Sequence, residues 1–141
     1  MFETVVIATD GSASAARAVS VALDFAAAFD ASVHALSVVE ERDLEGSPEE
    51  VRDDLEAALE ETAEDALAQV RDHTDRSVET AVREGDPDAE ITRYADEVDA
   101  DVVAVGTRGR HGEHAYLLGS VAEGLVRNCD RPVLTVRQLS A

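Results

Sequence analysis

Short apolar runs and helical patterns alternate along this chain, and this alternation restricts the fold more than any other feature of the sequence. Runs rich in β-branched residues occupy 2–9, 32–39, 77–83, 102–105 and 132–137. Between them, apolar residues at three- and four-residue steps predict helices over 13–29, from 48 to about 70, over 87–98 and over 120–128. Strands that alternate with helices form parallel sheets, and right-handed crossovers place helices on both faces.

The 141 residues fit one domain of this kind. We therefore expect a single α/β domain over residues 1–141, built on a doubly wound five-stranded parallel sheet with helices on both faces. In such sheets a ligand binds beyond the carboxyl ends of the strands, where the strand order reverses. The loops after the first and fourth strands contain the residues best suited to chemistry, and the strand order 3-2-1-4-5 would make these loops neighbours.

Capping signals mark the starts of two helices. Ser47 is expected to cap the long second helix, with Pro48 at its first position. The motif Gly85-Asp86-Pro87 marks the start of the third helix in the same way, with Pro87 at its first position. The long helix is expected to present one stripe to the sheet, made of Val51, Leu55, Leu59, Thr62, Ala66 and Val70.

A glycine-rich segment follows the fourth strand and leads into the last helix. Gly106, Gly109 and Gly119 would let backbone N–H groups approach an anion without a Cβ in the way, and Ser120 follows at the helix start. The unpaired N–H groups and the dipole of that helix favour a phosphate there. Two alternatives stay open: Gly106 and Gly109 form only a tight turn, and Ser120 caps the helix, which is compatible with phosphate binding.

Charged residues near both loops add to this pattern. Asp10 ends the first strand, where its carboxylate could accept hydrogen bonds from a ribose or an adenine amino group, hold a divalent ion, or cap the first helix. From Gly106 onward five arginines stand against three acids, a net charge of +2, whereas the rest of the chain sums to −21. Arg108 and Arg110 either assist phosphate binding or are solvated loop charges.

Composition excludes several partners and mechanisms. The 31 acidic and 12 basic residues give a formal charge of −19, which argues against binding to nucleic acid or to an anionic membrane. Every basic residue is an arginine, so the chain has no Walker-type phosphate lysine and no Schiff-base lysine. High Asp and Glu content without lysine resembles proteins of halophilic organisms, which accumulate salt in the cytoplasm.

Cysteine usage and hydropathy favour a cytoplasmic location. Cys129 is the single cysteine, which excludes an internal disulfide and favours a packing role over redox chemistry. No apolar run approaches the roughly 20 residues of a membrane span, and the start of the chain has no signal-peptide pattern. His111 and His114 form a weak ligand set, so no metal site is assigned. The sequence also provides no identifiable general base.

Four motifs together resemble the universal stress protein family, and in particular its ATP-binding branch. They lie at 6–12, at 85–87, at 105–110 with 119–123, and at 131–134, and the match covers the whole chain. The resemblance implies a five-stranded fold that binds an adenine nucleotide, with ATP, with or without Mg²⁺, across the ends of strands one and four. It also implies a homodimer that pairs through the C-terminal strand at 132–137.

The resemblance also carries a set of binding residues onto this sequence. Asp10 and the backbone at Val38 would face adenine and ribose, with Ala8, Val105 and the backbone of Thr9 beside them. Phosphate and ribose would be held by a second group, made of Gly106, Arg108, Gly109, Arg110, Gly119, Ser120 and Val121. Many relatives have a small hydroxyl residue where this chain has His111, so the sequence departs from the family pattern there.

These observations lead to one expected function and two alternatives. We expect a cytoplasmic ATP-binding module for stress response or regulation, whose nucleotide state modulates the interaction with an unidentified partner protein. The first alternative is a slow Mg²⁺-dependent ATP hydrolase with Asp10 at the metal. The second is a dimeric scaffold that works without nucleotide. Because no catalytic base is identified, a binding role is favoured over an enzymatic one.

Overall fold

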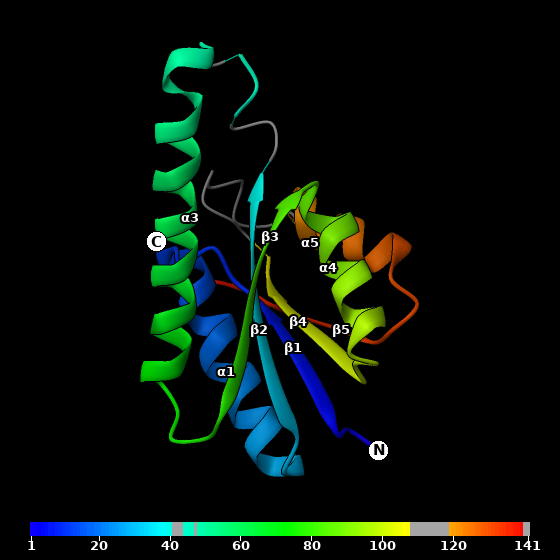
Figure 1. Cartoon of the computed structure of the whole chain (residues 1–141). Coiled ribbons are helices and arrows are strands. Elements are labelled where there is room, and N and C mark those ends of the chain that lie inside the picture. Colours follow the sequence, from blue (N-terminus) through cyan, green and yellow to red (C-terminus); the bar gives the residue numbers. More distant parts are fainter. Residues whose placement is uncertain (41–43, 47, 108–118, 140–141) are drawn as a thin grey trace.

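The fold is a parallel sheet whose neighbouring strands follow the order β3-β2-β1-β4-β5, in a computed structural model that describes residues 1–40, 44–46, 48–107 and 119–139 (Figure 1). This confirms the predicted α/β class and strand order. The strands are β1 (Thr4–Ala8), β2 (Ser32–Glu40), β3 (Val78–Gly85), β4 (Val102–Gly106) and β5 (Val133–Val136). The helices are α1 (Ala13–Phe29), α3 (Glu49–Asp72), α4 (Pro87–Glu97) and α5 (Ser120–Asn128).

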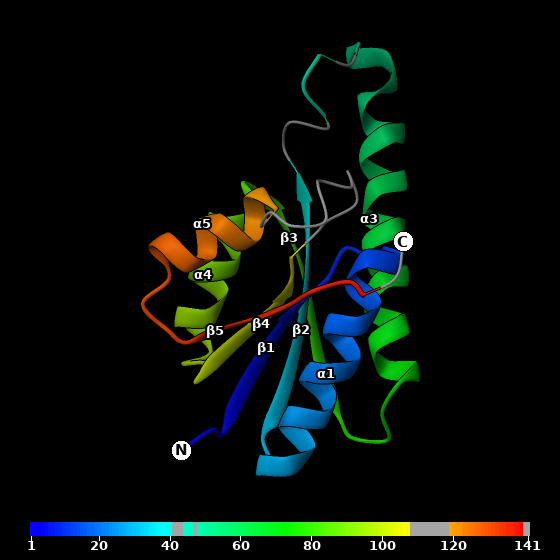
Figure 2. The same ribbon diagram turned by 180° about the vertical axis from the view of Figure 1, so that it is seen from behind.

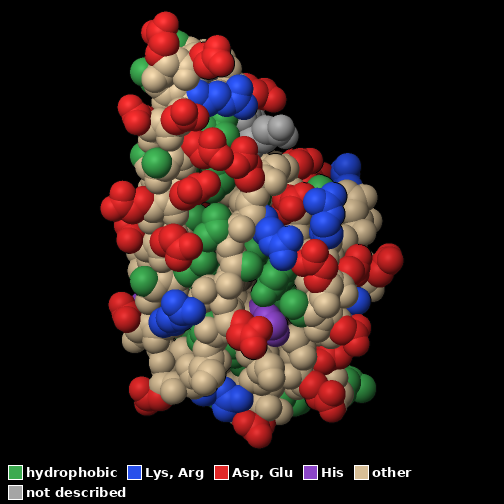
Figure 3. Space-filling view, viewed as in Figure 1, with side chains coloured by type: hydrophobic (Ala, Val, Ile, Leu, Met, Phe, Trp, Pro, Cys, Tyr) green, Lys and Arg blue, Asp and Glu red, His purple; other side chains and the backbone are tan. Residues whose placement is uncertain are grey.

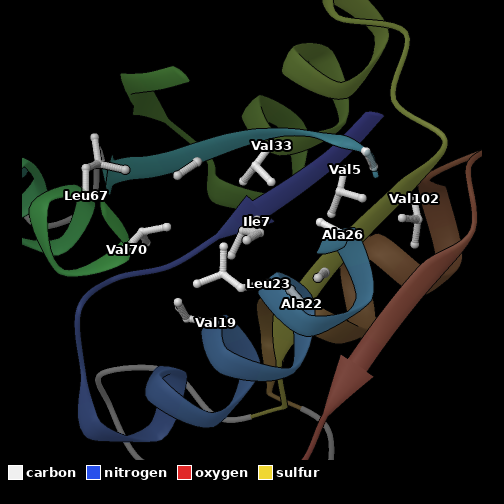
Figure 4. Close-up of a cluster of buried hydrophobic side chains, with 13 residues drawn as sticks. Val5, Ile7, Val19, Ala22, Leu23, Ala26, Val33, Leu67, Val70 and Val102 are labelled. Carbon is white, nitrogen blue, oxygen red and sulfur yellow. The ribbon is translucent and has the colours of Figure 1, made fainter. Parts of the chain in front are cut away.

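Two layers of helices cover the sheet, as Figures 1 and 2 show from opposite sides: α1 and α3 lie on one face, and α4 and α5 lie on the other. The core under α1 and α3 includes Ile7, Leu23 and Leu67, which point toward one another in Figure 4. A second core lies under α4 and α5 and includes Leu36 and Leu125, both 0% exposed. Because β1 and β4 are buried on both faces, they are apolar at almost every position.

Helix α3 differs from its prediction in how much of it is buried. Its buried side chains are Ala63, Ala66, Leu67 and Val70, all in its C-terminal half. In the predicted stripe, Val51 is 48% exposed, Thr62 is exposed, and Leu55 and Leu59 are only half-buried. The reason is visible in Figure 1, where the N-terminal half of α3 extends past the end of the sheet. The stripe of apolar residues along α3 is therefore longer than the sheet surface that can cover it.

The turn between β1 and α1 packs tightly on α3. Gly11 has a φ of +77°, a backbone conformation that glycine adopts without steric cost. A Cβ added at Gly11 would lie 2.9 Å from the Cβ of Ala66. Ser12 then caps α1, with its hydroxyl accepting a hydrogen bond from the N–H of Ala15 at 3.2 Å. Because Gly11 has no side chain and Ala66 has only a methyl group, α3 approaches this turn closely.

Polar side chains bind together the segments at the opposite end of the sheet, where β1, β4 and β5 begin. Asp101, just before β4, accepts hydrogen bonds from the N–H groups of Glu3 and Thr4 at 2.7 and 2.9 Å. Arg131, just before β5, contacts the carboxylates of Asp96, in the last turn of α4, and Asp99, just after that helix, at 3.2 and 3.1 Å. These contacts fix where the chain enters β1, β4 and β5. In the part of the chain that the structure describes, no helix is long and apolar enough to cross a membrane.

Candidate functional site

The carboxyl end of β1 leads into a compact polar turn. Ala8 ends the strand and is buried, and the N–H of Thr9 donates to the carbonyl of Leu36 at 3.0 Å. The hydroxyl of Thr9 accepts a hydrogen bond from the N–H of Gly11 at 3.1 Å. Asp10 accepts from the N–H of Ser12 at 2.9 Å. The alternative in which Asp10 caps α1 is therefore wrong, because Ser12 is the cap and Asp10 orders the turn before it.

The end of β4 is joined directly to the start of α5. Val105 and Gly106 end the strand, and the carbonyl of the next residue, Thr107, accepts a hydrogen bond from the N–H of Gly119. Gly119 is the N-cap of α5, and Ser120 is its first helical residue. The expectation that Ser120 supplies the N-cap hydroxyl is therefore wrong. Among the residues that the structure describes, no side chain bonds the first turn at this cap, so its N–H groups are suited to a ligand.

A hollow of about 460 Å³ lies between the carboxyl ends of β2 and β3 and the N-termini of α4 and α5. Its volume falls within the range of roughly 300–1,000 Å³ that is usual for small-molecule sites. Ser120 and Val121 line one side of it, while the opposite side comes from the chain after β2 and β3. The residues that line it are Glu40, Glu45, Gly85, Asp86, Pro87, Asp88, Ser120 and Val121.

The structure brings the predicted binding residues to one edge of the sheet. β1 lies between β2 and β4, so the turn at Asp10, the end of β2 near Val38 and the end of β4 at Gly106 are neighbours. Val38 is half-buried and packs with the core under α4 and α5. Of the predicted residues that the structure describes, only Ser120 and Val121 line the hollow itself. Arg108, Gly109 and Arg110 lie outside the described residues, as do His111 and His114.

Sequence reasoning missed the contribution of the β3–α4 junction to this hollow. Gly85 has a φ of +147°, and Pro87 stands at the first turn of α4, whose N-terminus also faces the hollow. The Gly85-Asp86-Pro87 motif was the available signal: it predicted the start of a helix and contributed to the family resemblance, but no binding role was assigned to it. Two helix N-termini therefore meet at this place, and their dipoles favour a bound anion.

Carboxylates surround these helix ends. Glu40, Glu45, Asp86 and Asp88 all line the hollow, and the carboxylate of Asp88 lies against α5, where a Cβ added at Gly124 would be 2.3 Å from it. The carboxylates of Glu45 and Asp88 would repel an anion with several negative charges, and a cation bound beside the anion would reduce this repulsion. The site thus combines backbone donors suited to phosphate with carboxylates suited to a divalent cation.

A separate group of carboxylates lies on α3 and β3. The side chains of Glu56, Glu60 and Glu84 have oxygen atoms within 4.8 Å of one another, and two of the three residues are exposed. Exposed acids gather in this way on very acidic proteins without an ion, because water and salt screen their repulsion. This trio is distinct from the hollow and is given no role.

The family pattern of the universal stress proteins matches residues 1–137. The chain belongs to the universal stress protein family. Over 142 aligned residues it is 35% identical to universal stress protein MJ0531 of Methanocaldococcus jannaschii, covering 98% of this chain and 84% of that protein. A putative universal stress protein of Staphylococcus saprophyticus, SSP1056, is 31% identical over 147 residues, covering 96% and 84%.

Solved universal stress proteins share the fold of this chain. The structure of protein MJ0577 of M. jannaschii superposes with a TM-score of 0.84 at 26% identity, covering 100% of this chain and 99% of that one. A universal stress protein in complex with cAMP has a TM-score of 0.70 at 29% identity, with 96% and 97% covered. The protein from Archaeoglobus fulgidus in complex with dAMP has a TM-score of 0.68 at 25% identity, with 97% and 100% covered. Two structural neighbours in this family thus bind adenine nucleotides.

Proposed function

We propose that this universal stress protein binds ATP and that the bound nucleotide controls its interaction with a partner protein in the cytoplasm. The observation that carries the proposal is the hollow between the N-termini of α4 and α5, at the carboxyl ends of β2 and β3. The phosphates would lie against the first turn of α5, at Gly119, Ser120 and Val121. Adenosine would lie toward Asp10 and the backbone at Val38.

The chemistry of the hollow supports Mg²⁺ as a companion of the nucleotide. Glu45 and Asp88 are among the residues that line it, and a triphosphate carries up to four negative charges, so the direct approach of the phosphates to these carboxylates is unfavourable. A divalent cation between a phosphate oxygen and a carboxylate of the hollow would remove this repulsion, since both groups are hard oxygen ligands. We expect ATP to bind more tightly with Mg²⁺ than with EDTA.

Equilibrium titration of the purified protein with ATP in 1 M KCl, with Mg²⁺ or with EDTA, tests the proposal. We expect a dissociation constant below 1 mM with Mg²⁺. Replacing Ser120 by Ala should weaken binding about tenfold, because a hydrogen bond to a charged group contributes about 1.5 kcal/mol. Ser20→Ala on the exposed side of α1 is the matched control and should change nothing. Absence of binding to ATP, AMP and cAMP at millimolar concentration would disprove the proposal.

Control of a partner by the nucleotide needs a second experiment. Cell extract is passed over the immobilised protein with ATP and Mg²⁺, and in parallel without nucleotide, and retained proteins are identified. We expect a protein whose retention differs at least several-fold between the two conditions and is lost when Ser120→Ala replaces the wild type. Equal retention under both conditions would contradict nucleotide control and favour the nucleotide-independent scaffold.

A further inference from the structure

A buried hydroxyl group beside the N-terminus of α5 has no partner in the described part of the protein. Thr107 is 7% exposed, and both of its backbone groups are bonded: its N–H donates to the carbonyl of Val136 at 3.0 Å, and its carbonyl accepts from the N–H of Gly119. Its Oγ1 forms no hydrogen bond to any described residue. Buried hydroxyls are almost always paired, so this one needs an explanation.

The fold places this hydroxyl under the first turn of α5. Side chains alternate between the two faces of a strand, and Val103 and Val105 lie in the core under α4 and α5. Thr107 is two residues beyond Val105, and its N–H continues the pairing with β5, so its side chain points to that same face. The bond between Thr107 and Gly119 brings the two residues into contact. The hydroxyl is therefore on the side of the sheet where α5 begins, and no side chain of the described residues caps the first turn of α5.

We propose that the hydroxyl of Thr107 donates a hydrogen bond to a phosphate oxygen of the nucleotide bound at the N-terminus of α5. This inference rests on the proposed function and adds a binding residue to it. A chain without lysine has to hold phosphate with neutral donors and arginine, and Thr107 is a donor held in place by two backbone hydrogen bonds. Little conformational freedom would be lost when it binds, which favours affinity.

The variant Thr107→Val tests this directly, because it replaces the hydroxyl by a methyl group of similar volume. We expect the dissociation constant for ATP with Mg²⁺ to rise about tenfold in titration calorimetry, while that for adenosine, which has no phosphate, stays within twofold. Thr107→Ser keeps the hydroxyl and should bind ATP within threefold of the wild type. Without ligand, Thr107→Val should unfold at the same temperature as the wild type or higher, because it removes an unpaired buried group.

Thr92 provides a matched control within the same protein. It lies within α4, its Oγ1 is also buried and without a partner among the described residues, and it is not part of the junction between β4 and α5 where Thr107 bonds Gly119. Thr92→Val should therefore leave the melting temperature equal or raised and leave ATP affinity unchanged. This comparison separates loss of a ligand contact from a general response of the fold to a missing hydroxyl.

Three results would overturn the inference. The first is that Thr107→Val binds ATP as tightly as the wild type does. The second is that it loses affinity for adenosine and for ATP equally. The third is that it melts several degrees lower without ligand, which would reveal a partner for the hydroxyl within the protein. In each case the wild type still binds ATP, so the proposed function stands. If the wild type binds no adenine nucleotide, the proposed function fails and the inference fails with it.

Discussion

At the scale of single residues, Asp101 shows how one carboxylate joins segments that lie far apart in the sequence. Its Oδ2 accepts hydrogen bonds from the N–H groups of Glu3 and Thr4, which hold the start of β1 beside β4. These two bonds favour the charged form and hold the pKa of Asp101 below its usual value. A carboxyl group with a lowered pKa in the folded state makes stability depend on pH.

Replacing Asp101 by Ala should lower the free energy of unfolding at pH 7, because two N–H groups lose a charged acceptor. The folded pKa is lowered, so this stabilisation is complete above the unfolded pKa of about 3.9 and is lost as pH falls through the lower folded value. The difference between wild type and variant should therefore shrink below about pH 4 in urea denaturation at a series of pH values. Asp75→Ala, at an exposed aspartate, should show neither effect.

At the scale of elements, periodicity and turn residues were enough to predict every strand and helix of the described fold, because each element follows its own local pattern. Contacts between elements were not predictable from these patterns. The stripe from Val51 to Leu59 has the right period, yet the sheet ends before it can cover those residues. Local signals also misplaced two helix starts by one position: Pro48 caps α3, with Ser47 outside the described residues, and Gly119 caps α5.

The candidate site was predictable to a similar degree. Asp10, Gly106 and Gly119 lie at the same end of the sheet as the hollow, because the carboxyl ends of parallel strands lie together. The hollow itself depends on how α4 and α5 pack against each other, and no single segment encodes that. Two features could be seen only in the three-dimensional structure: the contact of Asp88 with Gly124, and the hydroxyl of Thr107, which has no partner among the described residues.

The contact between the β1–α1 turn and α3 gives a prediction at this scale. Gly11→Ala should lower the free energy of unfolding by about 2–4 kcal/mol, because the added Cβ needs an unfavourable positive φ and would collide with Ala66. Gly46→Ala is the control. Its φ is +80°, but an added Cβ would meet no described atom within 4 Å apart from its chain neighbours, so only the backbone cost of about 1 kcal/mol is expected. Urea denaturation measures both.

A double-mutant cycle separates the collision from the strain at Gly11. In an Ala66→Gly background the Cβ at position 66 is gone, so Gly11→Ala should cost about 1 kcal/mol less than in the wild type. An equal cost in both backgrounds would show that α3 does not restrict this turn.

At the scale of the whole molecule, negative charge is the dominant property. The formal charge is −19, and acidic side chains cover α3 along its length in Figure 3. The helix alone contributes ten acids and two arginines. Like charges repel most in the compact folded state, so screening by salt should stabilise this protein. This is the physical basis for expecting salt to matter in a chain whose composition resembles proteins of halophilic organisms.

Raising KCl from 0.01 to 1 M should increase the melting temperature by about 5–10 °C, which corresponds to one or two kcal/mol for a domain of this size. The Debye length falls from about 30 to about 3 Å over this range, so most exposed repulsions are screened. Circular dichroism at several concentrations measures the rise. A melting temperature independent of KCl would show that charge repulsion does not limit stability.

A substitution in the edge strand β5 tests whether the expected homodimer pairs through 132–137. The carbonyls of Pro132 and Val136 pair with β4, so alternation turns the backbone of Thr135 outward, to the open edge. Thr135→Pro would remove an outward N–H and leave the pairing with β4 intact. We expect light scattering to give the mass of a dimer for the wild type and for Thr135→Val, and of a monomer for Thr135→Pro. A dimer in all three would place the interface elsewhere.

The extension of α3 beyond the sheet has a consequence for motion. Residues 49–62 contain no fully buried side chain, and only Leu55, Glu56 and Leu59 are half-buried, so about four turns of helix are held mainly by backbone hydrogen bonds and by the junction at Ala63. Such a segment opens at a small fraction of the free energy needed to unfold the domain. Its amide hydrogens should exchange with solvent orders of magnitude faster than those of β1, and a protease should cut there while the sheet stays intact.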